Sequence, residues 1–292
     1  MRILDKSQGI LSLEEIGVAD RGFEVLSRNI KKSHGMTLVT GPTGSGKTTT
    51  LYAVLAKLMS ASVNIVTLED PVEYRISEIN QSQINAEIGY SFASSLRTVV
   101  RQDPDIIMLG EIRDKETAEM AIHAALTGHI VLSTLHTNDA AGAIPRLIDM
   151  SIEPFLISSS VNTVVAQRLT RKLCPKCRQS FQPSEIEMKD VQAEIEKFPK
   201  DSKALISKEP MSFFQPKGCD ECNNTGYKGR IGVFEVLDVS EEIRELIIAR
   251  SSSDKIQAAA LAQGMTTMLQ DGILKAIKGM TSLEEVWRVT RE

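Results

Sequence analysis

A glycine-rich segment, GPTGSGKTT at residues 41–49, constrains this chain more than any other part of its sequence. It matches the pattern G-x-x-x-x-G-K-[ST], in which glycines let successive backbone N–H groups turn inward around phosphate oxygens. The apolar run 36–40 precedes the segment, and residues 48–59 follow it with apolar side chains at helical spacing. A strand, a glycine turn and a helix in this order predict a phosphate-binding loop that holds a nucleotide.

The loop assigns a role to each of its polar groups. Lys47 is expected to neutralise the β- and γ-phosphates, and Thr48 to hold Mg²⁺, while the following helix directs its positive end at the phosphates. The residues expected to bind the nucleotide are Gly41, Pro42, Thr43, Gly44, Ser45, Gly46, Lys47, Thr48 and Thr49.

Further apolar runs indicate an α/β fold. Residues 63–68, 105–109 and 130–135 are expected to form strands, and residues 117–126 a helix that ends near Gly128. Strands that alternate with helices require crossover connections and therefore a mostly parallel central sheet.

Two acidic residues follow these strands. Glu73 lies in the segment EDPVE at 69–73, and Glu111 ends the apolar run of RQDPDIIMLGE at 101–111, which has the form of a Walker B element. In a nucleotide site one carboxylate completes Mg²⁺ coordination while another positions the attacking water. Each acid taken alone could equally be a helix cap or a solvated turn residue.

Two histidines and two arginines are further candidates. His136 closes the run 130–135 and His129 opens it, so an imidazole could contact a γ-phosphate, although a lone histidine is more often structural. Arg97 and Arg101 lie four residues apart on one expected helix face, and Arg113 follows Glu111. Guanidinium groups stabilise a transferring phosphoryl group, but surface ion pairs are the alternative.

Four cysteines form two CxxC pairs, Cys174/Cys177 and Cys219/Cys222. This spacing predicts a closed tetrahedral Zn²⁺ site, with a disulfide or an iron–sulfur cluster as the alternatives. The pairs flank a charged segment in which 185–197 is expected to be helical and 199–216 shows no clear period. Beyond residue 240 we expect short helices over 241–250, 254–263 and 282–291.

Composition narrows the class of protein. The chain has 292 residues, 42% of them hydrophobic, which excludes a disordered chain, and its formal charge is −4. A mildly acidic chain lacks the overall basic charge that duplex nucleic acid usually selects, which leaves only a local basic patch open. No apolar run reaches the roughly 18 residues of a membrane span, and the start lacks a signal-peptide pattern, so we expect a cytosolic protein.

Taken together, five segments resemble the ATPases of type II secretion and type IV pilus assembly. The family's phosphate loop matches 41–49, and its Asp box, Walker B element and His box match TLEDPVEY, RQDPDIIMLGEIRD and TGHIVLSTLHTND. The four cysteines, followed by GYKGRIGVFEVL at 226–237, distinguish the chain from the related pilus retraction motors. The resemblance covers nearly the whole chain.

The resemblance implies roles for several residues. Glu73 becomes the general base, Glu111 the Walker B acid near Mg²⁺, and His129 and His136 the His-box pair. Arg97 and Arg101 become arginines on the γ-phosphate side, and Arg2 matches an arginine that ends the family's preceding domain.

It also implies an architecture: a RecA-like ATPase core over 1–172, a tetracysteine zinc subdomain over 173–230 and a helical region over 231–292. We expect ATP, Mg²⁺ and Zn²⁺ as cofactors, a hexamer in the full-length protein, and an inner-membrane platform protein as partner. The protein would be cytoplasmic and held at the inner membrane through that partner, and the chain would be the C-terminal motor portion.

Two other functions remain open from the residues themselves. A P-loop nucleic-acid translocase is disfavoured by the net charge and by the lack of interleaved aromatic and basic residues. A zinc-stabilised nucleotide-binding module without hydrolysis is disfavoured by Glu73, Glu111 and His136.

Overall fold

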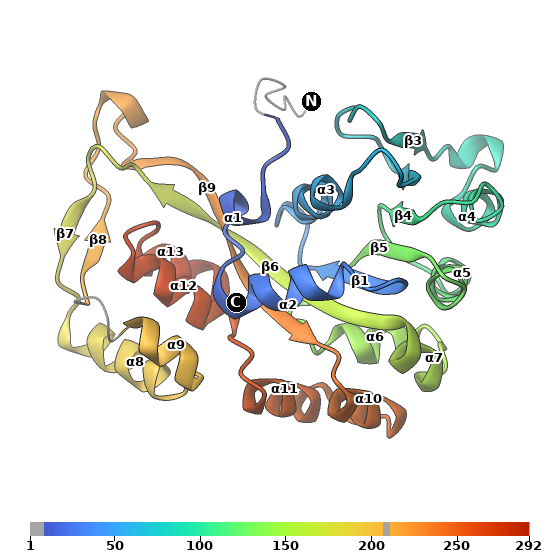
Figure 1. Ribbon diagram of the computed structural model, residues 1–292. Helices are drawn as coiled ribbons and strands as arrows, with labels where there is room; N and C mark the ends of the chain where they lie inside the picture. Colours follow the sequence, from blue (N-terminus) through green and yellow to red (C-terminus); the bar gives the residue numbers. More distant parts are fainter. Residues whose placement is uncertain (1–8, 207–210, 292) are drawn as a thin grey trace.

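The computed structural model describes residues 9–206 and 211–291 and is built on a seven-stranded sheet in the order β3-β2-β4-β5-β1-β6-β9 (Figure 1). Its strands are β1 (Gly35–Thr40), β2 (Ile65–Glu69), β3 (Asn80–Gln83), β4 (Ile106–Leu109), β5 (Ile130–Leu135), β6 (Val161–Leu173) and β9 (Tyr227–Asp238). Among the described residues, no helix is long and apolar enough to cross a membrane.

The sheet is parallel from β3 to β6, and β9 alone pairs antiparallel, with β6. β1, β2 and β4 are buried along their whole length. Strands that are covered on both faces read as continuous apolar runs, which is why these segments were recognisable in the sequence. The predicted α/β fold with a mostly parallel sheet is confirmed.

Helices cover both faces of the sheet. Leu38 and Val39 of β1 point to opposite faces, and each joins a different hydrophobic core. One face carries α1 (Leu13–Ile16), α2 (Asp20–Asn29) and α3 (Lys47–Leu58). The other carries α4 (Phe92–Val99), α5 (Lys115–Leu126), α6 (Ala143–Asp149), α7 (Pro154–Ser160), α10 (Glu241–Ile248) and α11 (Ser253–Ala262).

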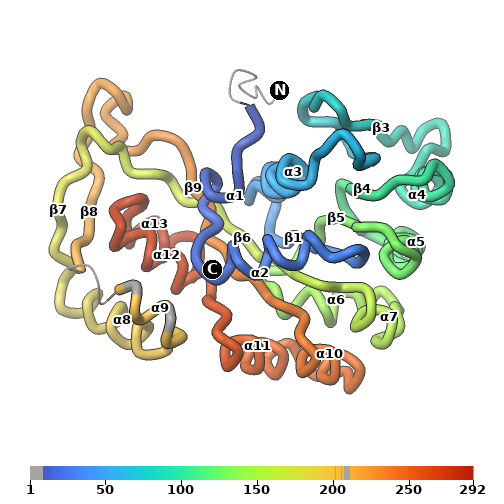
Figure 2. Tube along the Cα trace, viewed as in Figure 1, coloured from blue at the N-terminus to red at the C-terminus, as the bar shows by residue number. Residues whose placement is uncertain are grey.

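β6 and β9 extend past the sheet as a two-stranded ribbon toward a third hydrophobic core (Figure 2). That core involves β7 (Gln179–Phe181), α8 (Glu185–Glu196), α9 (Lys200–Ile206), β8 (Phe213–Gln215), α12 (Met268–Ile277) and α13 (Leu283–Thr290). β9 continues through residue 230, where the sequence places a boundary between domains. The division into three domains therefore stays a prediction.

Several elements differ from the sequence-based expectation. The segment 199–216 contains α9 and the short strand β8, which are too brief to show a period. α12 was not expected, although Thr267 and Gln270 form a capping box at its start. The capping-box pattern at Ser12 and Glu15 predicts a helix that continues to about Ala19, but α1 ends at Ile16, because Gly17 follows with φ 105° and its N–H closes the last turn.

A buried carboxylate ties the ribbon to α13. Glu285 is fully buried and accepts hydrogen bonds from the Arg171 backbone N–H and guanidinium, each at 2.8 Å, and from Arg288. Burial raises the pKa of Glu285, but these donors outweigh it and hold that pKa at about 2. The carboxylate is therefore charged and fully paired, which fixes α13 against the end of β6.

The contact between α12 and α13 leaves no space at Gly272. A Cβ there would lie 2.5 Å from Val286 Cγ1, closer than carbon atoms approach. We expect Gly272→Ala to lower the free energy of unfolding by about 1–2 kcal/mol, measured by urea denaturation. In a background that carries Val286→Ala, the same substitution at Gly272 should cost less stability, because the clashing methyl group is gone. An equal cost in both backgrounds would contradict a steric cause.

Candidate active site

The phosphate loop joins β1 to α3 and depends on three glycines with positive φ. Gly41, Gly44 and Gly46 have φ values of 147°, 81° and 90°, which residues other than glycine rarely adopt. Gly46 is the N-cap of α3 and offers no side chain to its first turn. The backbone N–H groups at this helix start are therefore available to an anion.

A cleft of about 630 Å³ opens at the carboxyl ends of β1, β2, β4 and β5. The phosphate loop and the first turn of α3 form one side of it. The sequence-predicted residues that line it are Thr43, Gly44, Gly46, Lys47, Thr48, Thr49, Glu73, Glu111, Arg113 and His136. Most of the predicted site is thus brought together by the crossover order of the sheet.

Lys47 folds back over the loop that precedes it. Its ammonium donates hydrogen bonds to the carbonyl oxygens of Gly41, at 2.9 Å, and Pro42, at 3.1 Å. Partial burial lowers the pKa of Lys47, while the nearby Glu111 carboxylate opposes this effect. A phosphate in the loop would give the ammonium a stronger partner than two neutral carbonyls.

Glu111 is the centre of a small charged cluster. Its carboxylate lies 2.6 Å from Arg113 Nε and 3.3 Å from His136 Nε2, and its side chain is 14% exposed. The hydrogen bond to Glu111 raises the pKa of Arg113. Thr134 holds the turn beneath them by donating to the Gly110 carbonyl at 2.7 Å. The ends of β4 and β5 therefore bring together the acid and the histidine that the sequence indicated.

Glu73 lines the cleft and is half-buried, and the segment before it is anchored by Glu69. Glu69 is buried and accepts hydrogen bonds from Tyr52, from Thr67 at 2.6 Å and from Gln81 at 3.1 Å. Burial, together with the bond to Glu69, raises the pKa of Tyr52 well above its usual range. Glu69 therefore holds in place the segment that presents Glu73.

Three predicted catalytic residues lie outside the cleft. Arg97 on α4 is 57% exposed and pairs with Glu116, and Arg101 lies beyond the end of α4, so the two do not share one helix. His129 precedes β5, at the end of the strand opposite His136, and its ring contacts the Ala124 carbonyl at 2.9 Å. Their predicted roles have no support from their positions within this chain. Arg2 lies outside the described residues.

Two residues near the phosphate loop were missed. Arg230 of β9 lines the cleft, so the antiparallel strand adds a guanidinium to it. Gln167 of β6 is buried against the loop and donates to the Ser45 carbonyl at 2.6 Å. Arg230 was visible in the sequence only as part of 226–237. Gln167 gave no signal, because a single glutamine in an apolar run has no pattern.

The loop after His136 is held from two sides. The Thr40 hydroxyl at the end of β1 bonds with the backbone of Thr137, accepting from its N–H at 2.8 Å. Glu235 of β9 is buried and accepts from the Ala140 N–H at 2.9 Å. Burial raises the pKa of Glu235, Asp139 adds to this effect and the backbone N–H donors oppose it, so that the pKa is about 7.

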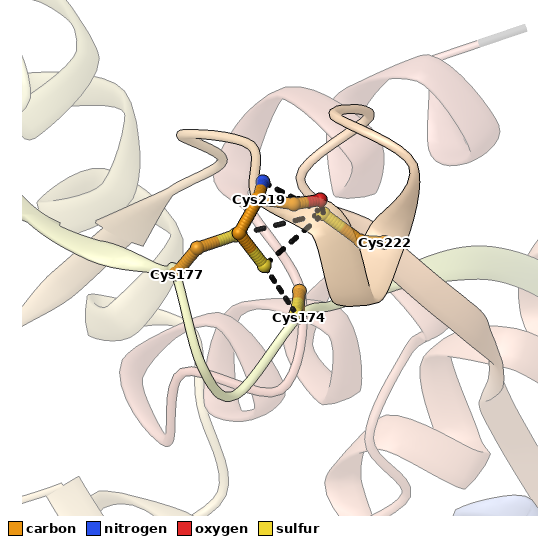
Figure 3. A group of neighbouring side chains, drawn as sticks. All are labelled: Cys174, Cys177, Cys219 and Cys222. Atoms are coloured by element: carbon orange, nitrogen blue, oxygen red, sulfur yellow. Dashed lines mark hydrogen bonds between the residues drawn. The ribbon is translucent and has the colours of Figure 1, made fainter.

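The four cysteines gather at the far end of the ribbon (Figure 3). All four sulfur atoms lie within 4.8 Å of one another, with Cys174 and Cys219 at 3.9 Å and Cys177 and Cys222 at 3.7 Å. A tetrahedron with metal–sulfur bonds of about 2.3 Å has sulfur–sulfur edges of about 3.8 Å. The donor set therefore fits one zinc ion, whereas disulfides would need sulfur atoms about 2 Å apart.

Backbone donors favour a thiolate in this group. Cys222 Sγ accepts from the N–H groups of Cys219 and Gly226, each at 3.2 Å. Burial raises the pKa of Cys222, but these N–H groups outweigh it and bring that pKa to about 6. Burial and the neighbouring thiols raise the pKa of Cys219 to about 12. The N–H groups of Cys219 and Gly226 therefore favour the thiolate form of Cys222.

The cleft also offers oxygen ligands of the kind that Mg²⁺ prefers. Thr48 supplies a hydroxyl and Glu111 a carboxylate, and both line the same cleft beside the phosphate loop. These donors fit the expected metal.

Comparisons with known proteins agree on one family. The family model described as type II/IV secretion system protein matches residues 1–288. Type II secretion system protein E of Pseudomonas aeruginosa is 47% identical over 295 residues, which cover 100% of this chain and 56% of that protein. The type IV pilus assembly ATPase PilB of Myxococcus xanthus is 46% identical over 98% of this chain and 49% of its own length. The chain thus spans about half the length of these relatives.

Solved structures share the fold. The pilus retraction motor PilT with bound ADP is 28% identical, with a TM-score of 0.70, covering 100% of this chain and 69% of that one. The ATPase DotB of Legionella pneumophila is 22% identical, with a TM-score of 0.65 over 96% of this chain and 65% of its own, and it supports the fold alone.

The raised pKa of Glu235 predicts a pH-dependent stability. The folded pKa of about 7 exceeds the ordinary 4.5, so this group's contribution to stability is complete below pH 4.5 and is lost as pH rises through 7. Glu235→Gln keeps an acceptor for the Ala140 N–H and removes the titration. Between pH 5 and 8 the variant should therefore gain about 3 kcal/mol relative to the parent in urea unfolding. Parallel stability curves would contradict the shift.

Proposed function

We propose, since the chain belongs to the family of type II/IV secretion system proteins, that it is the ATP-hydrolysing motor unit of a pilus or secretion machine. Its activity would power the assembly of a type IV pilus or of a type II secretion pseudopilus. Relatives named for both systems are nearly equally similar to the chain, at 47% and 46% identity, so both belong to the proposal.

One observation carries the proposal: the phosphate loop, Glu73, Glu111 and His136 come from four separated segments and line one cleft. A nucleotide-binding module without hydrolysis needs only the loop. Two carboxylates opposite it are what hydrolysis requires, because one acts at the metal and the other at the attacking water.

The position of each residue in the cleft indicates its role in ATP hydrolysis. Lys47 and the N–H groups at the start of α3 would bind the β- and γ-phosphates, and Thr48 and Glu111 would hold Mg²⁺, which neutralises charge on the transferring phosphoryl group. Glu73 would accept a proton from the attacking water. His136 would contact the γ-phosphate from the end of β5, where its ring lies beside the Glu111 carboxylate.

The family is also the basis for the proposed oligomeric state, partner and location of the motor. We propose a homo-oligomer, a hexamer in the full-length protein, and an inner-membrane platform protein as partner, with the motor on the cytoplasmic side. Arg97, Arg101 and His129 would then act across a boundary between subunits if they act in catalysis. Zn²⁺ bound by the four cysteines would be structural, because four thiolates leave no position for water.

A nucleic-acid translocase remains the weaker candidate. The chain carries 34 basic and 38 acidic residues and 4% aromatic residues. A surface that stacks bases along a basic groove needs both kinds of side chain.

Two substitutions separate binding from hydrolysis. We expect Lys47→Ala to weaken ATP binding at least about tenfold, or about 1.4 kcal/mol, because the phosphates lose their cation. Glu73→Gln should keep ATP affinity and lose hydrolysis, since only the transition state needs the carboxylate. Isothermal titration and phosphate release measure the two effects.

Lys115→Ala, at an exposed lysine of α5 outside the cleft, is the matched surface control. Unchanged hydrolysis in Glu73→Gln would reject the general base. Wild-type ATP affinity in Lys47→Ala would reject the nucleotide site itself.

Zinc content tests the cysteine site independently of activity. Purified protein should contain about one zinc ion per chain, and Cys222→Ser should lose it and unfold at lower temperature, because metal binding contributes to folding. Elemental analysis and thermal unfolding measure both effects, with Ser180→Ala on nearby β7 as a control. Protein without near-stoichiometric zinc, or with an iron chromophore, would overturn the assignment.

A further inference from the structure

Gln167 occupies a special position beside the phosphate loop. β1 ends at Thr40, which pairs with Ala166 of β6. On the β1 side of β6, Gln167 is therefore the first residue beyond the parallel pairing. It is buried, at 1% exposed, and its side chain contacts the loop that follows β1. A buried carboxamide requires hydrogen-bond partners at both ends.

Both ends of this carboxamide are paired. Nε2 donates to the Ser45 carbonyl at 2.6 Å, and Oε1 accepts from the Thr50 hydroxyl at 2.7 Å. Because nitrogen only donates and the carbonyl oxygen only accepts, one orientation of the amide satisfies both contacts. Gln167 thus links the loop to the first turns of α3.

The contact with Ser45 fixes one peptide unit of the loop. A trans peptide is planar, and its C=O and N–H point in opposite directions. When the Ser45 carbonyl points at Gln167, the N–H of Gly46 must point away from β6. Gly46 lines the cleft, so an N–H that points away from β6 at this position can face a phosphate bound there.

We propose that Gln167 is the positioning residue of the phosphate loop, which holds the Ser45–Gly46 peptide with its N–H toward a bound phosphate. Glycine at 46 makes such a restraint necessary, because its backbone rotates more freely than that of any other residue. The backbone of Gln167 also lies close to the loop, since a Cβ at Gly41 would lie 2.6 Å from the Gln167 backbone carbonyl oxygen. β6 therefore packs directly against the loop.

The inference rests on the proposed nucleotide site, and its test uses phosphate ligands. Gln167→Met keeps the length of the side chain but cannot donate to Ser45, so the peptide is free to turn. We expect affinity for a fluorescent ADP analogue with Mg²⁺ to fall about tenfold. Pyrophosphate, as a competitor, should lose affinity by the same factor, because the defect lies at the phosphates.

Thr170→Val is the matched control on the same strand. The Thr170 hydroxyl is buried and donates to the Ile231 carbonyl at 3.1 Å, away from the loop. Its loss should lower the unfolding temperature of ligand-free protein much as Gln167→Met does, while affinity for ADP stays within twofold. Equal weakening by both variants would mean that Gln167 acts through general stability, which overturns the proposal.

Thr50→Val tests the same contact if Gln167→Met does not fold. It removes only the hydroxyl that orients the carboxamide, and we expect a loss of about threefold in ADP affinity. Unchanged ADP affinity in Thr50→Val would overturn the proposal. Where Gln167→Met folds, the double variant should bind no more weakly than Gln167→Met alone, since both act through one contact. Additive losses would overturn the proposal.

Lys47→Ala distinguishes failure of this inference from failure of the proposed function. If Lys47→Ala weakens ADP binding and both Gln167→Met and Thr50→Val leave it unchanged, the loop does not depend on Gln167. If none of the three changes ADP binding, the nucleotide site is elsewhere.

Discussion

Parallel pairing of β1, β2, β4 and β5 is the constraint on which the rest of the molecule depends. It places the carboxyl ends of four strands at one edge of the sheet, so residues far apart in the chain meet there. Hydrophobic burial on both faces fixes the register, since a shift by one residue would exchange the two cores. The chemistry of the cleft therefore follows from packing on both sides of the sheet.

The parts that could be predicted are those with a local pattern. The phosphate loop, the apolar strands and the CxxC pairs each carry their signal within about ten residues, and the structure brings them together as expected. Glu111 and His136 were found because they end such strands.

The parts that were missed depend on distant partners. Gln167 bonds to residues 122 and 117 positions away, and Glu235 to one 95 positions away, which no local spacing encodes. Arg97 and Arg101 illustrate the reverse case, because their spacing suggested one helix face and the helix ends before Arg101. Charge and spacing alone do not reveal which side of an element faces the site.

The ribbon of β6 and β9 has a mechanical consequence. Gln167 touches the phosphate loop and Cys174 lies seven residues further along, roughly 23 Å at about 3.3 Å per residue. Between them the ladder shifts register near Arg171, beside its bonds to Glu285. The cysteine cluster is thus held at the end of a two-stranded ribbon that starts beside the cleft, so a given tilt of the ribbon at the cleft would displace the cysteines further than the residues next to the loop.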